Sequence, residues 1–219
     1  MTTGHGLDGA ADAGAFLARL VRLDPAALVR LRPAPGAGRT ALWARLPWGV
    51  LVVRTVTGTA PGDVTVTAGE LLAELAAGRA ALPRRRDDGW RWPLPPPTSR
   101  AVEALPAEDV RRIAAAAAGT LREAAAHGVA GRAVGQRALR DALLDHVAVV
   151  VTPDDAPNVP VEVPQRLIQG LVRMGFLGSG DVQVRVAGRW VGLIGPYGGA
   201  WSRKGAELAL TPAIPHPNG

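Results

Sequence analysis

The 219-residue sequence contains no cysteine, a single lysine (Lys204), and only two phenylalanines and one tyrosine. The absence of cysteine excludes disulfides, thiolate metal sites, iron–sulfur clusters and cysteine nucleophiles. No apolar stretch approaches the roughly 20 residues that a membrane-spanning helix needs. The opening stretch MTTGHGLDGAADAG lacks the basic and apolar regions of a signal peptide. We therefore expect a cytoplasmic protein with no membrane partner.

Motifs for nucleotide binding and for catalysis are also missing. The sequence has no G-x-x-x-x-G-K-[ST], no G-x-S-x-G and no H-E-x-x-H. Glu123 and His127 share a helix face, but no second pair of metal ligands accompanies them. We expect no metal and no cofactor, and the sequence favours a non-catalytic protein. An enzyme of unknown class is the weaker alternative, because sites assembled in space leave no local motif.

Charge is distributed unevenly along the chain. The formal net charge is +6, from 25 basic and 19 acidic residues. Residues 164–205 hold six basic residues and one acid, a net +5, which leaves only +1 for everything else. A charge of this sign permits a phosphate-rich partner.

The N-terminal part predicts a small unit of helices and strands. Apolar spacing predicts a helix over about 11–23, and LVRLRP is typical of a strand. Residues 40–58 predict a hairpin that turns at Leu46-Pro47-Trp48-Gly49. A strand at Val64 and Val66 then leads into a helix that Thr67 and Glu70 would open as a capping box. Residues 1–10 are small and polar, and we expect them to fray.

The stretch LPRRRDDGWRWPLPPP, residues 82–97, is too rich in proline to join a helix or the centre of a sheet. Trp90 and Trp92 are two residues apart, so an extended chain would point them the same way. One interpretation is a platform on which a ligand or base stacks. The other, which buried area favours, is that both rings fix a connecting strap to a folded surface.

The second half is expected to be mainly helical, with a β-hairpin near its end. The spacing predicts helices over about 105–128, 134–146 and from Pro164 to Gly175. The run VAVVV, residues 147–151, predicts a buried strand, and residues 182–195 alternate as a hairpin. A last strand could follow within PYGGAWSRKGAELAL. Both halves run helix first and hairpin later, but their spacings do not superimpose, so we expect no internal repeat.

The helix from Pro164 carries glutamine and arginine on one side, and a basic hairpin follows it. This order is the outline of a winged helix, in which the helix enters the major groove and the hairpin contacts phosphates. An ordinary amphipathic helix packed on a sheet is the alternative. Under the first interpretation the nucleic-acid contacts would be Arg166, Gln169, Arg173, Arg185, Arg189, Arg203 and Lys204.

The sequence thus predicts an α+β fold of two small lobes joined by a proline-rich strap, with a C-terminal lobe that resembles a winged helix in outline. The expected divisions are an N-terminal lobe (1–81), the strap (82–98), a C-terminal lobe (99–211) and a tail (212–219). The predicted function is non-catalytic nucleic-acid binding, to DNA or RNA, through the C-terminal lobe. The alternative is a protein–protein adaptor that uses a surface with Trp43 and Trp48.

Overall fold

The computed structural model describes residues 4–127, 136–153 and 159–204. The described helices are α1 (Ala10–Leu23), α2 (Ala68–Ala76), α3 (Ala107–His127), α4 (Gln136–Asp145), α5 (Gln165–Arg173) and a 3₁₀ turn, η1 (Asp87–Gly89). The strands are β1 (Leu28–Pro33), β2 (Arg39–Arg45), β3 (Leu51–Thr57), β4 (Val64–Thr67), β5 (Arg100–Leu105), β6 (Val147–Val151), β7 (Val161–Pro164), β8 (Val182–Ala187), β9 (Trp190–Gly195) and β10 (Gly198–Arg203). The fold is α+β, as predicted.

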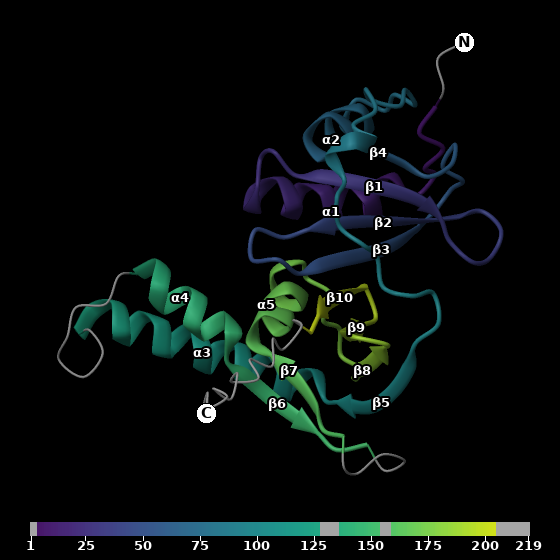
Figure 1. The fold of residues 1–219 in the computed structure, drawn as a ribbon. Coiled ribbons are helices and arrows are strands. Elements are labelled where there is room, and N and C mark those ends of the chain that lie inside the picture. Colours follow the sequence, from purple (N-terminus) through teal and green to yellow (C-terminus); the bar gives the residue numbers. More distant parts are fainter. Residues whose placement is uncertain (1–3, 128–135, 154–158, 205–219) are drawn as a thin grey trace, which may run out of the picture.

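Eight strands form one antiparallel sheet in the order β4-β1-β2-β3-β10-β9-β8-β5, and β6 and β7 form a separate pair. The two lobes share this sheet, which is continuous across a seam where β3 pairs with β10. Figure 1 shows α1 and α2 beside the first four strands, α5 beside the last strands, and α3 with α4 extending away from the sheet. The helices of both lobes and one face of the sheet enclose a common core.

The two lobes contain equivalent strands in the same order, counted from each outer edge of the sheet toward the seam: β4, β1, β2 and β3 in one lobe, and β5, β8, β9 and β10 in the other. Each lobe has a helix followed by three meandering strands (α1 with β1–β3, and α5 with β8–β10), and each has an outer strand followed by a helix (β4–α2 and β5–α3). The strand–helix pair comes last in the first lobe and first in the second. The structure therefore contains a permuted repeat, which a comparison of the halves at a fixed spacing does not detect.

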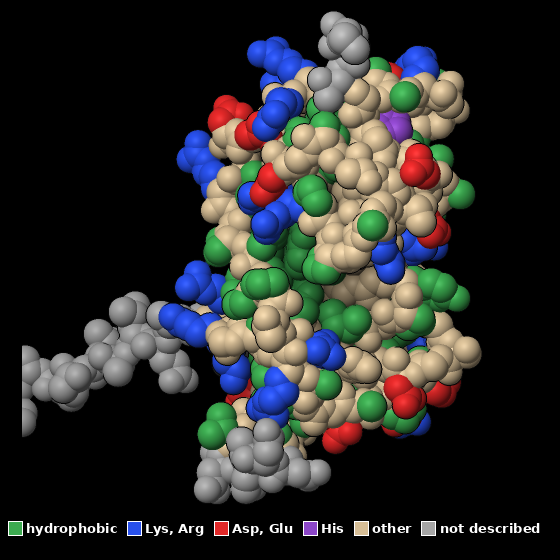
Figure 2. Space-filling view, turned by 90° about the vertical axis from the view of Figure 1, so that its right-hand side faces the viewer, with side chains coloured by type: hydrophobic (Ala, Val, Ile, Leu, Met, Phe, Trp, Pro, Cys, Tyr) green, Lys and Arg blue, Asp and Glu red, His purple; other side chains and the backbone are tan. Residues whose placement is uncertain are grey.

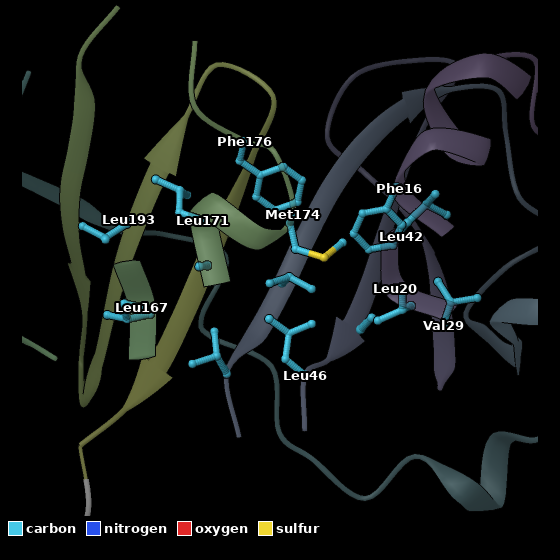
Figure 3. Close-up of a cluster of buried hydrophobic side chains, with 14 of the residues drawn as sticks. Phe16, Leu20, Val29, Leu42, Leu46, Leu167, Leu171, Met174, Phe176 and Leu193 are labelled. Atoms are coloured by element: carbon cyan, nitrogen blue, oxygen red, sulfur yellow. The ribbon is translucent and has the colours of Figure 1, made fainter. Parts of the chain in front are cut away.

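The seam between the lobes is filled by the chain's only two phenylalanines, Phe16 of α1 and Phe176 just after α5. Their rings stack with centroids 6.3 Å apart and planes 4° from parallel, and both side chains are fully buried. Met174 extends from the second lobe toward Phe16 and Leu42 (Figure 3). Such aromatic pairs stabilise by about 0.5–1.5 kcal/mol beyond the area that they bury.

The winged-helix outline does not match the structure. The helix α5 lies against the sheet that contains β9 and β10, and Leu167, Ile168 and Leu171 are fully buried there. The hairpin of β8 and β9 is an inner part of the eight-stranded sheet and not a free wing. The alternative of an amphipathic helix packed on a sheet is the arrangement found.

Local signals placed most element ends correctly. Gly49 has a φ of 85°, which the predicted turn between β2 and β3 requires and which glycine adopts without strain. Thr67 precedes α2 as predicted, but no side-chain capping bond to the backbone forms. Its hydroxyl instead donates to the Glu70 carboxylate at 2.5 Å. The expected capping box is therefore incomplete.

Several segments differ from the sequence prediction, among them β7, which was not predicted. Residues 100–105 form the edge strand β5, which was not predicted, and its pairing with β8 shifts register between Ala101 and Glu103. The run 147–151 is a strand, but Val150 is 57% exposed because β6 pairs only with β7. From Gly4 onward the N-terminal segment is not frayed. His5 is buried, donating from Nε2 to Arg79 O and accepting the Leu7 N–H at Nδ1.

The strap crosses the sheet face opposite the helices, from the outer strand of one lobe to the outer strand of the other. At its start Arg86 N–H donates to Thr65 O on β4, and Asp87 accepts the Thr65 N–H. At its end the Arg185 guanidinium on β8 donates to Ser99 Oγ and Ser99 O. The predicted tail, residues 212–219, lies outside the described residues.

The two tryptophans of the strap pack onto this face. Trp90 and Trp92 meet edge to face with centroids 5.5 Å apart, and Trp90 Nε1 donates to Trp92 O. The Arg30 guanidinium lies 5.7 Å from the Trp90 ring centroid, and that of Arg45 lies 5.0 Å from the Trp92 centroid. The rings therefore anchor the strap, which is the interpretation that buried area favoured.

We expect Trp90→Ala to lower the free energy of unfolding by about 2 kcal/mol, measured by urea denaturation. The substitution removes the apolar contacts of a half-buried ring and its cation–π interaction with Arg30. This costs less stability than the loss of a fully buried tryptophan ring. The exposed neighbour Arg91 provides the control, and Arg91→Ala should change the same quantity by less than about 0.5 kcal/mol. Equal values for the two variants would show that the strap is not anchored through Trp90.

The Asp87 carboxylate gives the strap a pH-dependent anchor. Burial raises its pKa, but the hydrogen bond from Thr65 N–H and the Arg85 guanidinium outweigh burial and hold the pKa below its ordinary value. The folded state therefore favours the charged carboxylate. The resulting stabilisation is present above the unfolded-state pKa of about 3.9 and disappears as the pH falls through the folded-state value.

We expect Asp87→Ala to lower the free energy of unfolding by about 1 kcal/mol at pH 7, a small value because the side chain is 45% exposed. The difference from the unsubstituted chain should shrink steadily below about pH 4. Urea unfolding between pH 7 and pH 2.5 measures it. Asp88→Ala, at the exposed neighbouring carboxylate, should show no such trend. A pH-independent difference for Asp87→Ala would contradict the assignment.

Candidate interaction surfaces

The largely apolar hollow on the sheet face opposite the helices lies between the sheet and the strap, and we call it the strap groove. Its volume is about 710 Å³. The end of β1 and the loop that follows it, from Arg32 to Pro35, form one wall, and the strap from Leu94 to Pro97 with the adjoining Ser99 forms the other. Figure 2 shows hydrophobic side chains lining a hollow in the middle of the side that carries this loop and the strap.

The floor of the strap groove is made of side chains from four adjacent strands. Trp43, Val53, Trp201 and Ile194 come from β2, β3, β10 and β9 and point to the same face. The Trp201 ring lies against the backbone of Gly192, where an added Cβ would be 2.5 Å from the ring. Glycine at this position lets the ring lie low over the sheet. The floor is therefore broad, flat and rich in aromatic surface.

The charge around the strap groove is positive. Arg32 and Arg185 line it, and no carboxylate does so among the described residues. Arg32 is 47% exposed and pairs with Asp63, whereas Arg185 also donates to Gln183 Oε1. Three nitrogen atoms of Arg185 are thus engaged by the chain itself. Arg185 fixes the strap to β8, and Arg32 is the more accessible cation.

A second concavity, which we call the basic hollow, lies where the β8–β9 turn and the end of β10 meet β6 and β7. Its volume is about 840 Å³. The basic residues that line it are Arg166, Arg189, Arg203 and Lys204, and the acidic residues are Asp145 and Glu162. Arg166 forms an ion pair with Asp145, and Arg189 donates to Lys204 O at 3.2 Å.

A third, smaller hollow lies at the junction of α3, α4 and α5, and we call it the helix-junction hollow. Trp48, Gln165, Gln169, Arg140 and Arg173 line it together with alanine and leucine side chains. Trp48 Nε1 donates to Arg166 O at 3.2 Å, and the Arg166 guanidinium donates to Trp48 O at 3.3 Å. This reciprocal pair fixes the β2–β3 turn against α5.

The structure distributes the seven predicted nucleic-acid contacts over three surfaces. Arg166, Arg189, Arg203 and Lys204 share the basic hollow, Gln169 and Arg173 line the helix-junction hollow, and Arg185 lies at the strap groove. Trp43 and Trp48 are also separated, because Trp43 faces the strap and Trp48 faces α5. No local sequence pattern indicated the strap groove, because its floor is made of strands from both lobes.

The described residues contain no cluster of three or more histidine, aspartate or glutamate side chains that could hold a metal ion. Among the helices described, none is both long enough and apolar enough to cross a membrane. The pKa values that shift belong to surface ion pairs such as Arg79 with Glu74, whose hydrogen bond raises the pKa of the arginine and lowers that of the glutamate.

Solved structures with a similar fold include bacterial sliding clamps. Caulobacter crescentus pol III beta is 13% identical, with a TM-score of 0.54 over 96% of this chain and 68% of that one. The DNA polymerase III subunit beta from Pseudomonas aeruginosa is also 13% identical, with a TM-score of 0.55 over 96% and 68%. The Helicobacter pylori beta clamp in complex with Carprofen is 12% identical, with a TM-score of 0.53 over 93% and 63%. The chain thus spans about two thirds of the length of these clamps, and at this identity the likeness concerns the fold.

No curated protein matches the chain. Residues 6–92 match the family model described as Domain of unknown function (DUF8010). The two family models that match meet within the strap, where the first ends at residue 92 and the second begins at residue 94. The second model covers residues 94–207, more than half of the chain, and the chain therefore belongs to the family described as Domain of unknown function (DUF8185).

Proposed function

We propose that the chain is a non-catalytic interaction protein whose strap groove binds an extended peptide segment of a protein partner. The observation that carries this proposal is the groove itself, an open and largely apolar channel of about 710 Å³ between a flat sheet and a wall of prolines. Open concavities with a largely apolar lining are the usual form of a binding site on a folded protein. Peptide-binding grooves commonly combine aromatic rings with a small number of polar groups.

The chemistry of the groove selects the kind of peptide. The half-buried ring of Trp43 offers a contact surface for apolar side chains, and the Trp201 ring, 6% exposed, closes the groove floor. Arg32, which pairs with Asp63 but remains 47% exposed, places a cation at the rim. Since no carboxylate lines the groove among the described residues, an acidic peptide meets no like charge there. We therefore propose a segment in which apolar residues alternate with or flank aspartate or glutamate.

The fold supports a place for this protein in a DNA-associated assembly. The similar structures are β subunits of DNA polymerase III, and the C. crescentus β sliding clamp has been solved with PEG bound to a putative beta-motif tethering region. A shared fold can serve different functions, so the partner of this chain follows from its own groove.

A random peptide library displayed on phage, selected against the full chain, tests the proposal. We expect enriched peptides to combine apolar and acidic residues, and to bind at least tenfold more weakly to Thr55→Trp, which places a large ring on the groove floor. The control Ser179→Trp adds the same ring at an exposed site outside the groove and should leave binding unchanged. Arg32→Glu should weaken the acidic peptides by a similar factor. Peptides that bind Thr55→Trp with unchanged affinity would overturn the proposal.

A second candidate function is contact with a nucleic-acid backbone through the basic hollow. The observation in its favour is that Arg189, in the turn between β8 and β9, and Arg203 and Lys204, at the end of β10, converge on one concavity. Arg166 is held by Asp145 and by the Trp48 carbonyl, so the other three cations are the ones available to phosphates. Gln169, Arg173 and Arg185 lie elsewhere and are not required for this contact.

Fluorescence anisotropy with labelled duplex DNA, measured between 50 and 200 mM salt, tests the second candidate. If Arg189 and Arg203 each neutralise a phosphate, replacing both with alanine should flatten the log–log slope by about 1.8, since each contact contributes about 0.9. Arg173→Ala, on another surface, is the matched control and should leave the slope unchanged. Absence of binding at 50 mM salt would contradict this candidate.

A further inference from the structure

The helix-junction hollow contains a buried polar group without a partner. Gln165, the first residue of α5, is 3% exposed, and its backbone N–H donates to His146 O. Its side-chain Nε2 is buried and makes no hydrogen bond with the described residues. A buried amide left unpaired costs about 1–3 kcal/mol, so such a group calls for an explanation.

Two cations lie at the same hollow and are also unpaired. The side chains of Arg140 on α4 and Arg173 at the end of α5 are exposed, and within the described residues neither makes a hydrogen bond or an ion pair. Other surface arginines of the chain, such as Arg111 and Arg112 on α3, are paired with acids one turn away. No carboxylate lines the helix-junction hollow among the residues described.

The rest of the hollow is apolar and small. The ring of Trp48 and the side chains of Leu121, Leu143 and Leu144 line a space of about 160 Å³. A cavity of roughly 150 Å³ with such a lining accommodates a benzene-sized molecule. The hollow therefore offers an apolar compartment for a six- to eight-atom body, an amide donor and two guanidinium groups.

We propose that the helix-junction hollow binds a small aromatic or branched aliphatic carboxylate. The apolar body would occupy the space against Trp48 and the leucines, and the carboxylate would accept hydrogen bonds from Arg173 and Arg140. Guanidinium groups bind carboxylates through paired, charge-assisted hydrogen bonds, which explains the preference for this anion over a neutral group. On binding, the Gln165 side chain would turn its buried amide toward a ligand oxygen and so gain the partner that it lacks. This site is separate from the strap groove and from the basic hollow.

Titration calorimetry of the full chain with benzoate, benzyl alcohol and benzylamine tests the proposal, because the three probes have similar size and differ in charge. We expect benzoate to bind with a dissociation constant on the order of 1 mM, as fits a fragment of nine heavy atoms. Benzyl alcohol should bind at least fivefold more weakly, and benzylamine should not bind measurably. Equal affinity for the three probes, or no benzoate binding at 10 mM, would overturn the proposal.

Two variants locate the site. Arg173→Gln removes an exposed charge without touching the core, and it should weaken benzoate at least fivefold while leaving benzyl alcohol unchanged. Ala117→Leu fills the hollow from α3 and should abolish binding of both. Arg112→Gln, also on α3 but outside the hollow, is the control and should bind benzoate as the unsubstituted chain does. Should Ala117→Leu unfold, as far-ultraviolet circular dichroism would reveal, Arg173→Gln alone decides. Unchanged benzoate affinity in Arg173→Gln would overturn the assignment.

Discussion

The stacked rings of Phe16 and Phe176 fill the centre of the seam between the two lobes, which meet there along a short strand pairing and are also joined by the hydrogen bonds between Trp48 and Arg166. β3 and β10 share three paired positions, Gly199 with Val53, Ala200 with Val52 and Trp201 with Leu51. The phenylalanine pair lies on the helix side of this seam, and Trp201 with Leu51 lies on the strap side. The seam is therefore packed on both faces, which makes the eight strands one surface. The strap groove and the helix-junction hollow depend on that continuity, because each draws residues from both lobes, whereas the basic hollow is lined by the C-terminal lobe alone.

Signals that act over a few residues were sufficient to place most helices and strands. The turn at Gly49, the start of α5 after Pro164 and the end of α5 at Gly175 were all predictable because glycine and proline restrict the backbone locally. The edge strand β5 was missed because its hydrogen-bonding partner, β8, lies about 80 residues further along the chain and nothing local requires the pairing. The repeat was missed because its two parts occur in opposite order.

The candidate sites were less predictable than the fold. The charge count of residues 164–205 was correct, but it could not show that Arg185 and Arg189, four residues apart, belong to different surfaces. Side chains alternate between the two faces along β8, and the chain then turns, so Arg185 and Arg189 lie on opposite sides of the sheet. The count also could not show that Arg166 is occupied by Asp145, which lies outside that window. Charge along a chain predicts a contact surface only when the fold keeps those residues on one side.

The permuted order of the repeat has a consequence for how the lobes find each other. It makes the outer strand of each lobe, β4 and β5, neighbours in sequence, so a single connection runs from one edge of the sheet to the other. Each half keeps its own helices, its three meandering strands and its outer strand on one side of that connection. A chain cut within residues 93–98 would leave two structurally complete halves. Their association would then depend on the concentration of each half in solution. The intact strap removes this dependence, because it fixes the effective concentration of one half around the other.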